Sequence, residues 1–139
     1  MKQLLALIFF AFLLNGCNKE EVKFEAFSPE SFAFDIGEMW EVNALVNVKG
    51  FVQKEAGGTY SASIQYTVNM ITPEGKTITN VFEDTKVVNE KEEITDIPLE
   101  VQFEIDSTFT LGKYKLHFTI QDNFSEKSTE TTIEFDLTE

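Results

Sequence analysis

The clearest feature of this chain is a strict alternation of apolar and polar residues. Residues 60–70 read Tyr-Ser-Ala-Ser-Ile-Gln-Tyr-Thr-Val-Asn-Met, with an apolar or aromatic side chain at every second position. The same period of two runs through residues 40–48, 99–106, 114–120 and 133–137. Successive side chains of a strand point to opposite faces, so each segment is predicted to be a strand with one face on a core and the other in water.

Shorter apolar segments predict further strands at residues 22–27, 32–36, 77–82 and 85–89. Turn-forming residues separate the segments, at Gly57-Gly58, Pro73-Glu74-Gly75-Lys76 and Asp122-Asn123. After Cys17 no window has the spacing of an amphipathic helix. The pattern predicts an all-β fold, an antiparallel two-sheet sandwich of seven to nine strands.

One motif makes the fold class more specific. Leu111-Gly112-Lys113-Tyr114 resembles the tyrosine corner of Greek-key immunoglobulin-like domains, which implies that the Tyr114 hydroxyl bonds to backbone upstream. Gln121-Asp122-Asn123 and the final strand resemble the F–G hairpin of such domains. The chain has no cysteine pair, and Trp40, predicted inward, lies on the second long strand instead of the usual third. These departures indicate the looser immunoglobulin-like or fibronectin-like class, not an antibody-type domain.

The N-terminus has the features of an export signal. Lys2 precedes an unbroken apolar run from Leu4 to Leu14, which is shorter than the roughly 20 residues of a membrane-spanning helix. The next residues, Leu14-Asn15-Gly16-Cys17, resemble the lipobox of bacterial lipoproteins. The resemblance implies cleavage after Gly16, a diacylglycerol thioether on Cys17 and fatty acylation (palmitate) of the new amino terminus. The alternative is a free cysteine buried behind an ordinary signal peptide.

These features divide the chain into a helical signal peptide (1–16), a lipidated N-terminus with a short tether (17–21) and an immunoglobulin-like domain (22–139). Within the tether, Asn18-Lys19-Glu20-Glu21 resembles a surface-export signal of lipoproteins in one Gram-negative phylum, although a solvated linker would have the same composition. The predicted location is the cell envelope, at the outer membrane and exposed on the surface if that signal operates. The tether reaches at most about 18 Å, which favours a partner in or near the same membrane.

The charge balance narrows the choice of partners. All 24 acidic residues follow Cys17, against 10 lysines and no arginine, so the side chains from there on carry a net charge of −14. Phosphate recognition needs clusters of Lys or Arg that displace counterions. The composition therefore argues against nucleic acid, and against an anionic membrane surface bound by charge alone.

Candidate chemistry is sparse. His117 is the only histidine and is predicted on a water-facing strand surface, where a nucleophile and an orienting carboxylate are not expected to converge on it. Zinc would need clustered Cys and His ligands, which the chain lacks. The loop with Glu90, Glu92, Glu93 and Asp96, and the turn at Asp122-Asn123, are candidates for calcium but lack the fixed ligand offsets of calcium loops. No cofactor, metal or enzymatic activity is predicted.

Two further features concern modification and binding. Asp106-Ser107-Thr108 resembles a short O-glycosylation motif of exported proteins, with Ser107 as the acceptor. Phe51, Phe109 and Phe124 are predicted near loops, where aromatic residues either anchor a partner or close the ends of the sandwich.

The leading functional hypothesis is a membrane-anchored, non-enzymatic module that binds a protein or glycan partner near the same membrane. The alternative is a structural subunit of an envelope assembly such as a secretion or conjugation apparatus. Gly37-Glu38 and Asp122-Asn123-Phe124 loosely resemble a conjugative-transfer lipoprotein family.

Overall fold

The computed structural model describes residues 20–139. The signal peptide, the lipobox and Cys17 lie outside the described residues. The described part has eight strands: β1 (Glu25–Asp35), β2 (Met39–Lys49), β3 (Lys54–Ala56), β4 (Thr59–Ile71), β5 (Thr77–Glu90), β6 (Ile97–Asp106), β7 (Gly112–Asp122) and β8 (Ser128–Leu137). Within residues 20–139 we find no helix of the length and apolar character needed to cross a membrane.

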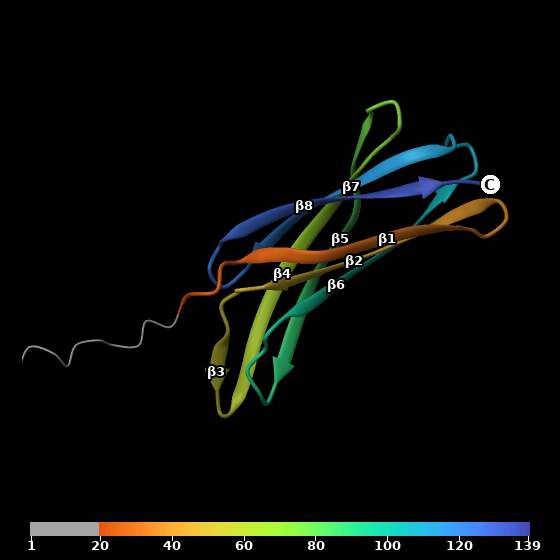
Figure 1. The fold of residues 1–139 in the computed structure, drawn as a ribbon. Helices are drawn as coiled ribbons and strands as arrows, with labels where there is room; N and C mark the ends of the chain where they lie inside the picture. The colour runs from red at the N-terminus through yellow and green to blue at the C-terminus, as the bar shows by residue number, and fades with distance from the viewer. Residues whose placement is uncertain (1–19) are drawn as a thin grey trace, which may run out of the picture.

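The strands form two antiparallel sheets packed face to face (Figure 1). Sheet A has the order β1-β2-β6, and sheet B the order β5-β4-β7-β8, with β3 pairing the start of β4 beyond the end of β7. The chain crosses between the sheets after β2, after β5 and after β6. The predicted all-β fold, an antiparallel two-sheet sandwich of seven to nine strands, is therefore confirmed.

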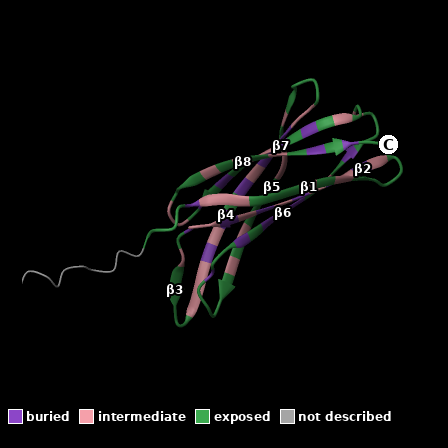
Figure 2. Cartoon of the chain, viewed as in Figure 1, coloured by how far each residue is buried: buried purple, intermediate pink, exposed green. Residues whose placement is uncertain are grey.

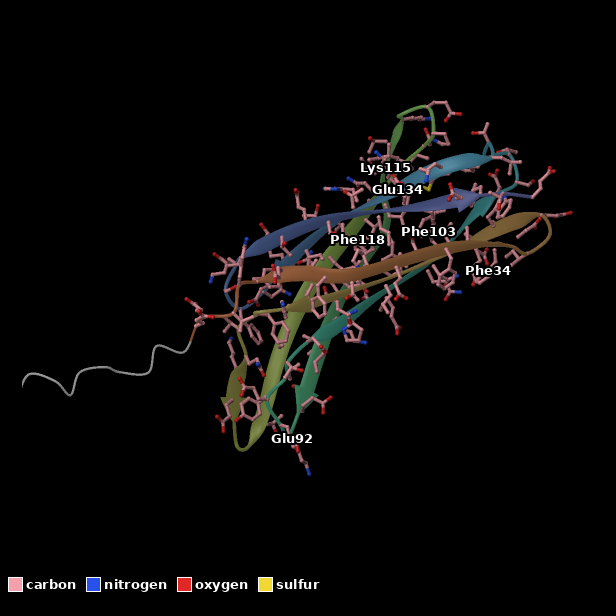
Figure 3. The ribbon with its side chains drawn as sticks, in the orientation of Figure 1. Phe34, Glu92, Phe103, Lys115, Phe118 and Glu134 are labelled. Atoms are coloured by element: carbon pink, nitrogen blue, oxygen red, sulfur yellow. The ribbon has the colours of Figure 1, made fainter. Side chains whose placement is uncertain are left out.

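The core consists of the inward positions that the alternation predicts. Along β2 every second residue from Trp40 to Val48 is buried, and the same holds along β4 from Ala62 to Met70 (Figure 2). Phe118 of β7 is fully buried between the sheets (Figure 3). Removing such a ring would cost about 3–5 kcal/mol, so these inward faces supply much of the stability.

The tyrosine corner is present. The Tyr114 side chain is 1% exposed, and its hydroxyl donates to the backbone carbonyl of Thr110 at 2.7 Å. The Tyr114 ring stacks on Phe135 of β8, with centroids 5.3 Å apart. The hydrogen bond between Tyr114 and Thr110 fixes the loop between β6 and β7, in which the chain crosses from sheet A to sheet B.

Strand boundaries differ from expectation in two places where a β-bulge interrupts the alternation. Residues 22–27 and 32–36 were predicted as two strands, but β1 is a single strand whose register shifts between Phe27 and Glu30. Residues 77–82 and 85–89 likewise belong to the single strand β5, which bulges near Asn80, where φ is 54°. In β1 the bulge adds one residue and reverses the phase of the pattern, so that one strand reads as two. In β5 the shift adds two residues and keeps the phase, and the predicted break at residues 83–84 falls on two polar residues within the strand.

The ends of these elements add two details. β1 begins at Glu25 instead of Val22, and Phe24 just before it is buried while Val22 is 59% exposed. β3 was not predicted; it pairs with β4 across a tight turn at Gly57-Gly58, whose φ values of 59° and 79° suit a type I′ hairpin.

Candidate functional site

The outward surface of sheet A differs from that of sheet B. Side chains of directly paired residues lie on the same face of a sheet, so the strand register assigns each residue to a face. We call the outward surface of sheet A the aromatic face. It consists of Glu25, Phe27, Glu30, Phe32 and Phe34 of β1, Met39, Glu41, Asn43, Leu45, Asn47 and Lys49 of β2, and Pro98, Glu100, Gln102, Glu104 and Asp106 of β6.

Two exposed phenylalanines lie on this face, on the edge strand β1. Phe32 and Phe34 are 48% and 54% exposed, their ring centroids are 5.1 Å apart, and the ring planes are inclined by 60°. Ile36, 52% exposed, follows in the turn after β1. Large apolar side chains that cluster on a surface mark interaction sites more often than isolated ones do.

The bulge in β1 is the reason these rings point outward. Before the bulge Ala26 pairs with the inward residue Val48, whereas after it the inward residue Val42 pairs with Ala33. The inward positions of β1 thus change from even to odd numbers, and a shift of one residue moves every following side chain to the opposite face. Phe32 and Phe34 go to the surface, and Ser31 and Ala33 face inward.

Small inward residues suit this place in the fold because β1 comes close to β8 of the other sheet. The Ser31 hydroxyl donates to the backbone carbonyl of Glu134 in β8 at 2.7 Å. A phenylalanine in the position of Ser31 would keep the two edges apart.

A groove of about 570 Å³ adjoins the aromatic face. It lies beside β6, the edge strand of sheet A, and β5, at the edge of sheet B, whose inward side chains are at most partly buried. Its lining residues are Glu30, Phe32, Asn43, Ala44, Leu45, Tyr66, Phe82, Asp84, Lys86, Glu100, Val101 and Gln102.

Tyr66 fixes the two sheets to each other beneath this groove. Its side chain is 2% exposed, and its hydroxyl donates to the Glu100 carbonyl of β6 at 2.7 Å. Burial, together with the negative charges of Asp84 and Glu100, raises the pKa of Tyr66 to about 12. The phenol is therefore a neutral donor at physiological pH, and the groove has a fixed floor.

The aromatic face is acidic. Its carboxylates are Glu25, Glu30, Glu41, Glu100, Glu104 and Asp106, and its one lysine is Lys49. The outward surface of sheet B is polar and more balanced, with Lys113 of β7 3.3 Å from Glu134 and 3.9 Å from Asp136 of β8. The hydrogen bond to Glu134, and then the charge of Asp136, raise the pKa of Lys113. Figure 3 shows Phe34 on one side of the sandwich and Lys115 and Glu134 on the other.

His117 lies on this outward surface of sheet B. Its Nδ1 is 2.9 Å from the Thr132 hydroxyl and its Nε2 3.7 Å from a Glu130 carboxylate oxygen. The side chain is 31% exposed, as expected for a histidine on a water-facing strand.

Asp122 has a structural role that the sequence did not indicate. It is fully buried, and its carboxylate accepts hydrogen bonds from the Val52 amide (2.8 Å), the Phe124 amide (3.0 Å) and the Ser125 hydroxyl (2.7 Å). It therefore joins the loop after β2 to the turn between β7 and β8. Its oxygens are occupied by the protein's own donors.

The other acidic candidates are also exposed: Glu90 is the last residue of β5, and Glu92, Glu93 and Asp96 lie in the loop before β6. Among residues 20–139 no three His, Cys, Asp or Glu side chains are grouped closely enough to hold a metal ion.

The remaining candidates lie at the ends of the sandwich. Ser107 is exposed in the turn after β6, beside Asp106, whose carboxylate accepts bonds from the Thr108 hydroxyl and amide that lower the pKa of Asp106. Phe51 is buried and Phe109 packs on the Tyr114 ring, so these two close the sandwich instead of anchoring a partner. Phe124 is partly exposed, with the Lys54 ammonium 4.0 Å from its ring centroid.

Comparison with known proteins gives no family. No family model and no curated protein matches the chain. Among solved structures, a protein from Archaeoglobus fulgidus is similar at a TM-score of 0.39 and 14% identity, over 82% of this chain and 97% of that one. An X-ray structure of a Northeast Structural Genomics Consortium target gives 0.40 and 13%, over 86% and 87%. At TM-scores below 0.5 neither likeness bears on function.

Proposed function

We propose that this protein is a non-enzymatic, membrane-anchored lipoprotein of the cell envelope that binds a partner through its aromatic face. The observation that carries the proposal is the outward orientation of Phe32 and Phe34 beside a groove. Phe32 and Phe34 are about half exposed, so each forgoes about half of the roughly 1.5–3 kcal/mol that complete burial contributes, and a partner would recover that part.

The position of the face supports binding by an anchored domain. Residue 20 and the turn between β1 and β2 lie at opposite ends of the sandwich (Figure 1). With lipid on Cys17, as the lipobox suggests, the N-terminal end would lie near the membrane. Phe34 and Ile36 would then be presented at the far end, where a partner protruding from the same membrane can reach them.

The proposal is tested by crosslinking in intact cells. A photoreactive phenylalanine analogue replaces Phe34 in one variant and Val87 in a control. Val87 is 60% exposed on the outward surface of sheet B, so it matches Phe34 in exposure and differs in face. A discrete adduct is expected from position 34 and not from position 87. If neither position gives an adduct, or both give the same ones, the aromatic face is not a binding surface.

The adduct would also decide between the two functional hypotheses. Secretion or transfer components attached at position 34 would indicate a structural subunit of an envelope assembly. A partner outside such machinery would indicate a separate binding or adhesion module.

A further inference from the structure

A carboxylate lies beside the exposed rings without a cation. Glu41 pairs with Phe34 across β1 and β2, so both side chains lie on the aromatic face. The Asn43 side-chain amide donates to Glu41 Oε1 at 2.9 Å, and Asn43 itself pairs with Phe32. Within residues 20–139 Glu41 forms no ion pair.

Elsewhere on the same face, a lysine does lie close to both a carboxylate and an aromatic ring. Near the other end of β1, the Lys49 ammonium lies 3.2 Å from a Glu25 oxygen and 5.3 Å from the centroid of the Phe27 ring. A carboxylate and an aromatic face together stabilise an ammonium or guanidinium more than either does alone. Phe34 and Glu41 supply the ring and the carboxylate but, in the described part of the chain, no lysine lies over the Phe34 ring.

The groove beside the aromatic face is lined by both acidic and apolar side chains. Glu30, Glu100 and Asp84 border it, against the single cation Lys86, and Leu45 and Phe82 add apolar surface. A ligand that fits would alternate basic and apolar side chains, which is the pattern of an extended polypeptide segment.

Other occupants fit the face less well. A second copy would bring a surface with six carboxylates and one lysine against its like, and anionic lipid would be repelled in the same way. A sugar ring stacks on a flat aromatic surface, whereas Phe32 and Phe34 are inclined by 60°.

We infer that the partner of the aromatic face is a protein segment rich in lysine or arginine, one basic side chain of which lies on Phe34 and pairs with Glu41. This inference rests on the proposed function and names the chemistry of the partner.

The test uses the full mature protein in neutral detergent and three short synthetic peptides. The peptides share their apolar residues and differ at the variable positions, which are all Lys, all Gln or all Glu. We expect the Lys peptide to bind tightest and to weaken as salt is raised, because surface charges are screened.

Matched variants locate the binding. Glu41→Gln removes the charge but keeps an amide oxygen for Asn43, and Phe34→Leu keeps apolar area but removes the ring. Each should weaken binding of the Lys peptide about two- to fivefold. The controls are Glu83→Gln and Val87→Ser, both on sheet B; Glu83 resembles Glu41 because it accepts from an asparagine amide, that of Asn80 at 3.2 Å. The controls should leave the affinity unchanged.

The inference is overturned if the three peptides bind equally, if the Gln or Glu peptide binds tightest, or if the Glu41 and Phe34 variants behave like their controls. A dimer of the mature protein that Phe34→Leu dissociates would make a second copy the occupant. A glycan or an acidic protein crosslinked to position 34 would leave the proposed function standing and refute only the basic partner.

Discussion

Replacing Asp122 with alanine tests whether one buried carboxylate holds two loops together. The substitution removes the acceptor of three hydrogen bonds. Two of the donors, the amides of Val52 and Phe124, are backbone groups and cannot rotate toward another acceptor. The Ser125 hydroxyl can rotate toward water. An orphaned buried donor costs about 1–3 kcal/mol, so the loss of the acceptor for these two amides in Asp122→Ala should lower the free energy of unfolding by roughly 2–6 kcal/mol. A domain of this size is stable by only about 5–15 kcal/mol, so the loss is large.

Equilibrium unfolding of the mature protein in urea measures this loss. Asp122→Asn keeps one carbonyl oxygen, which can still accept from Val52, and should lie between the wild type and alanine. Asp96→Ala removes an exposed aspartate of the loop before β6 and should change the free energy by less than about 0.5 kcal/mol. The structural role of Asp122 would be refuted if Asp122→Ala unfolded at the same urea concentration as the wild type, or at a concentration no lower than that of the Asp96→Ala control.

The other predictions concern the tyrosine corner, the groove and the anchor. Tyr114→Phe removes the donor to the Thr110 carbonyl and should cost about 1–3 kcal/mol, whereas His117→Ala should stay within about 0.5 kcal/mol; urea titrations in the reverse order would contradict the strand register. Folding raises the pKa of Tyr66 from 10.0 to about 12. The contribution of its neutral phenol to the free energy of unfolding is therefore complete below pH 10 and is lost as the pH rises toward 12. The loss is roughly 3 kcal/mol, and Tyr66→Phe should remove that part of the pH dependence; an unchanged dependence would exclude this phenol as its source. Cys17→Ala should abolish labelling by fatty acid and release the protein from membranes, and a native chain with a free Cys17 thiol on intact-mass analysis would refute lipidation.

The sequence predicts the fold wherever burial decides the pattern. In β2, β4, β6 and β7 one face lies on the core, and apolar residues at every second position fix both the strand and its orientation. The tyrosine corner is also local, since Tyr114 and Thr110 are four residues apart. Such features require no knowledge of the rest of the chain.

The binding surface could not be predicted in this way. Phe32 and Phe34 continue the even-numbered phase of Phe24 and Ala26, so the pattern alone places their rings inside. The one local signal for the bulge is Ser28-Pro29: Ser28 has a positive φ of 48°, and proline within a strand is confined to edges and bulges. The structural role of Asp122 could not be predicted either, because its partner Val52 is 70 residues away in the sequence.

Solvent protection in intact cells tests the binding role of the aromatic face most directly. Gln102→Cys and Gln65→Cys place thiols at exposed positions on the outward surfaces of sheets A and B. The rate at which a small maleimide labels each thiol is compared between cells and the purified mature protein. We expect labelling at position 102 to be slower in cells than in the purified protein, and labelling at position 65 to be the same in both. Equal ratios at the two positions would contradict a partner on the aromatic face.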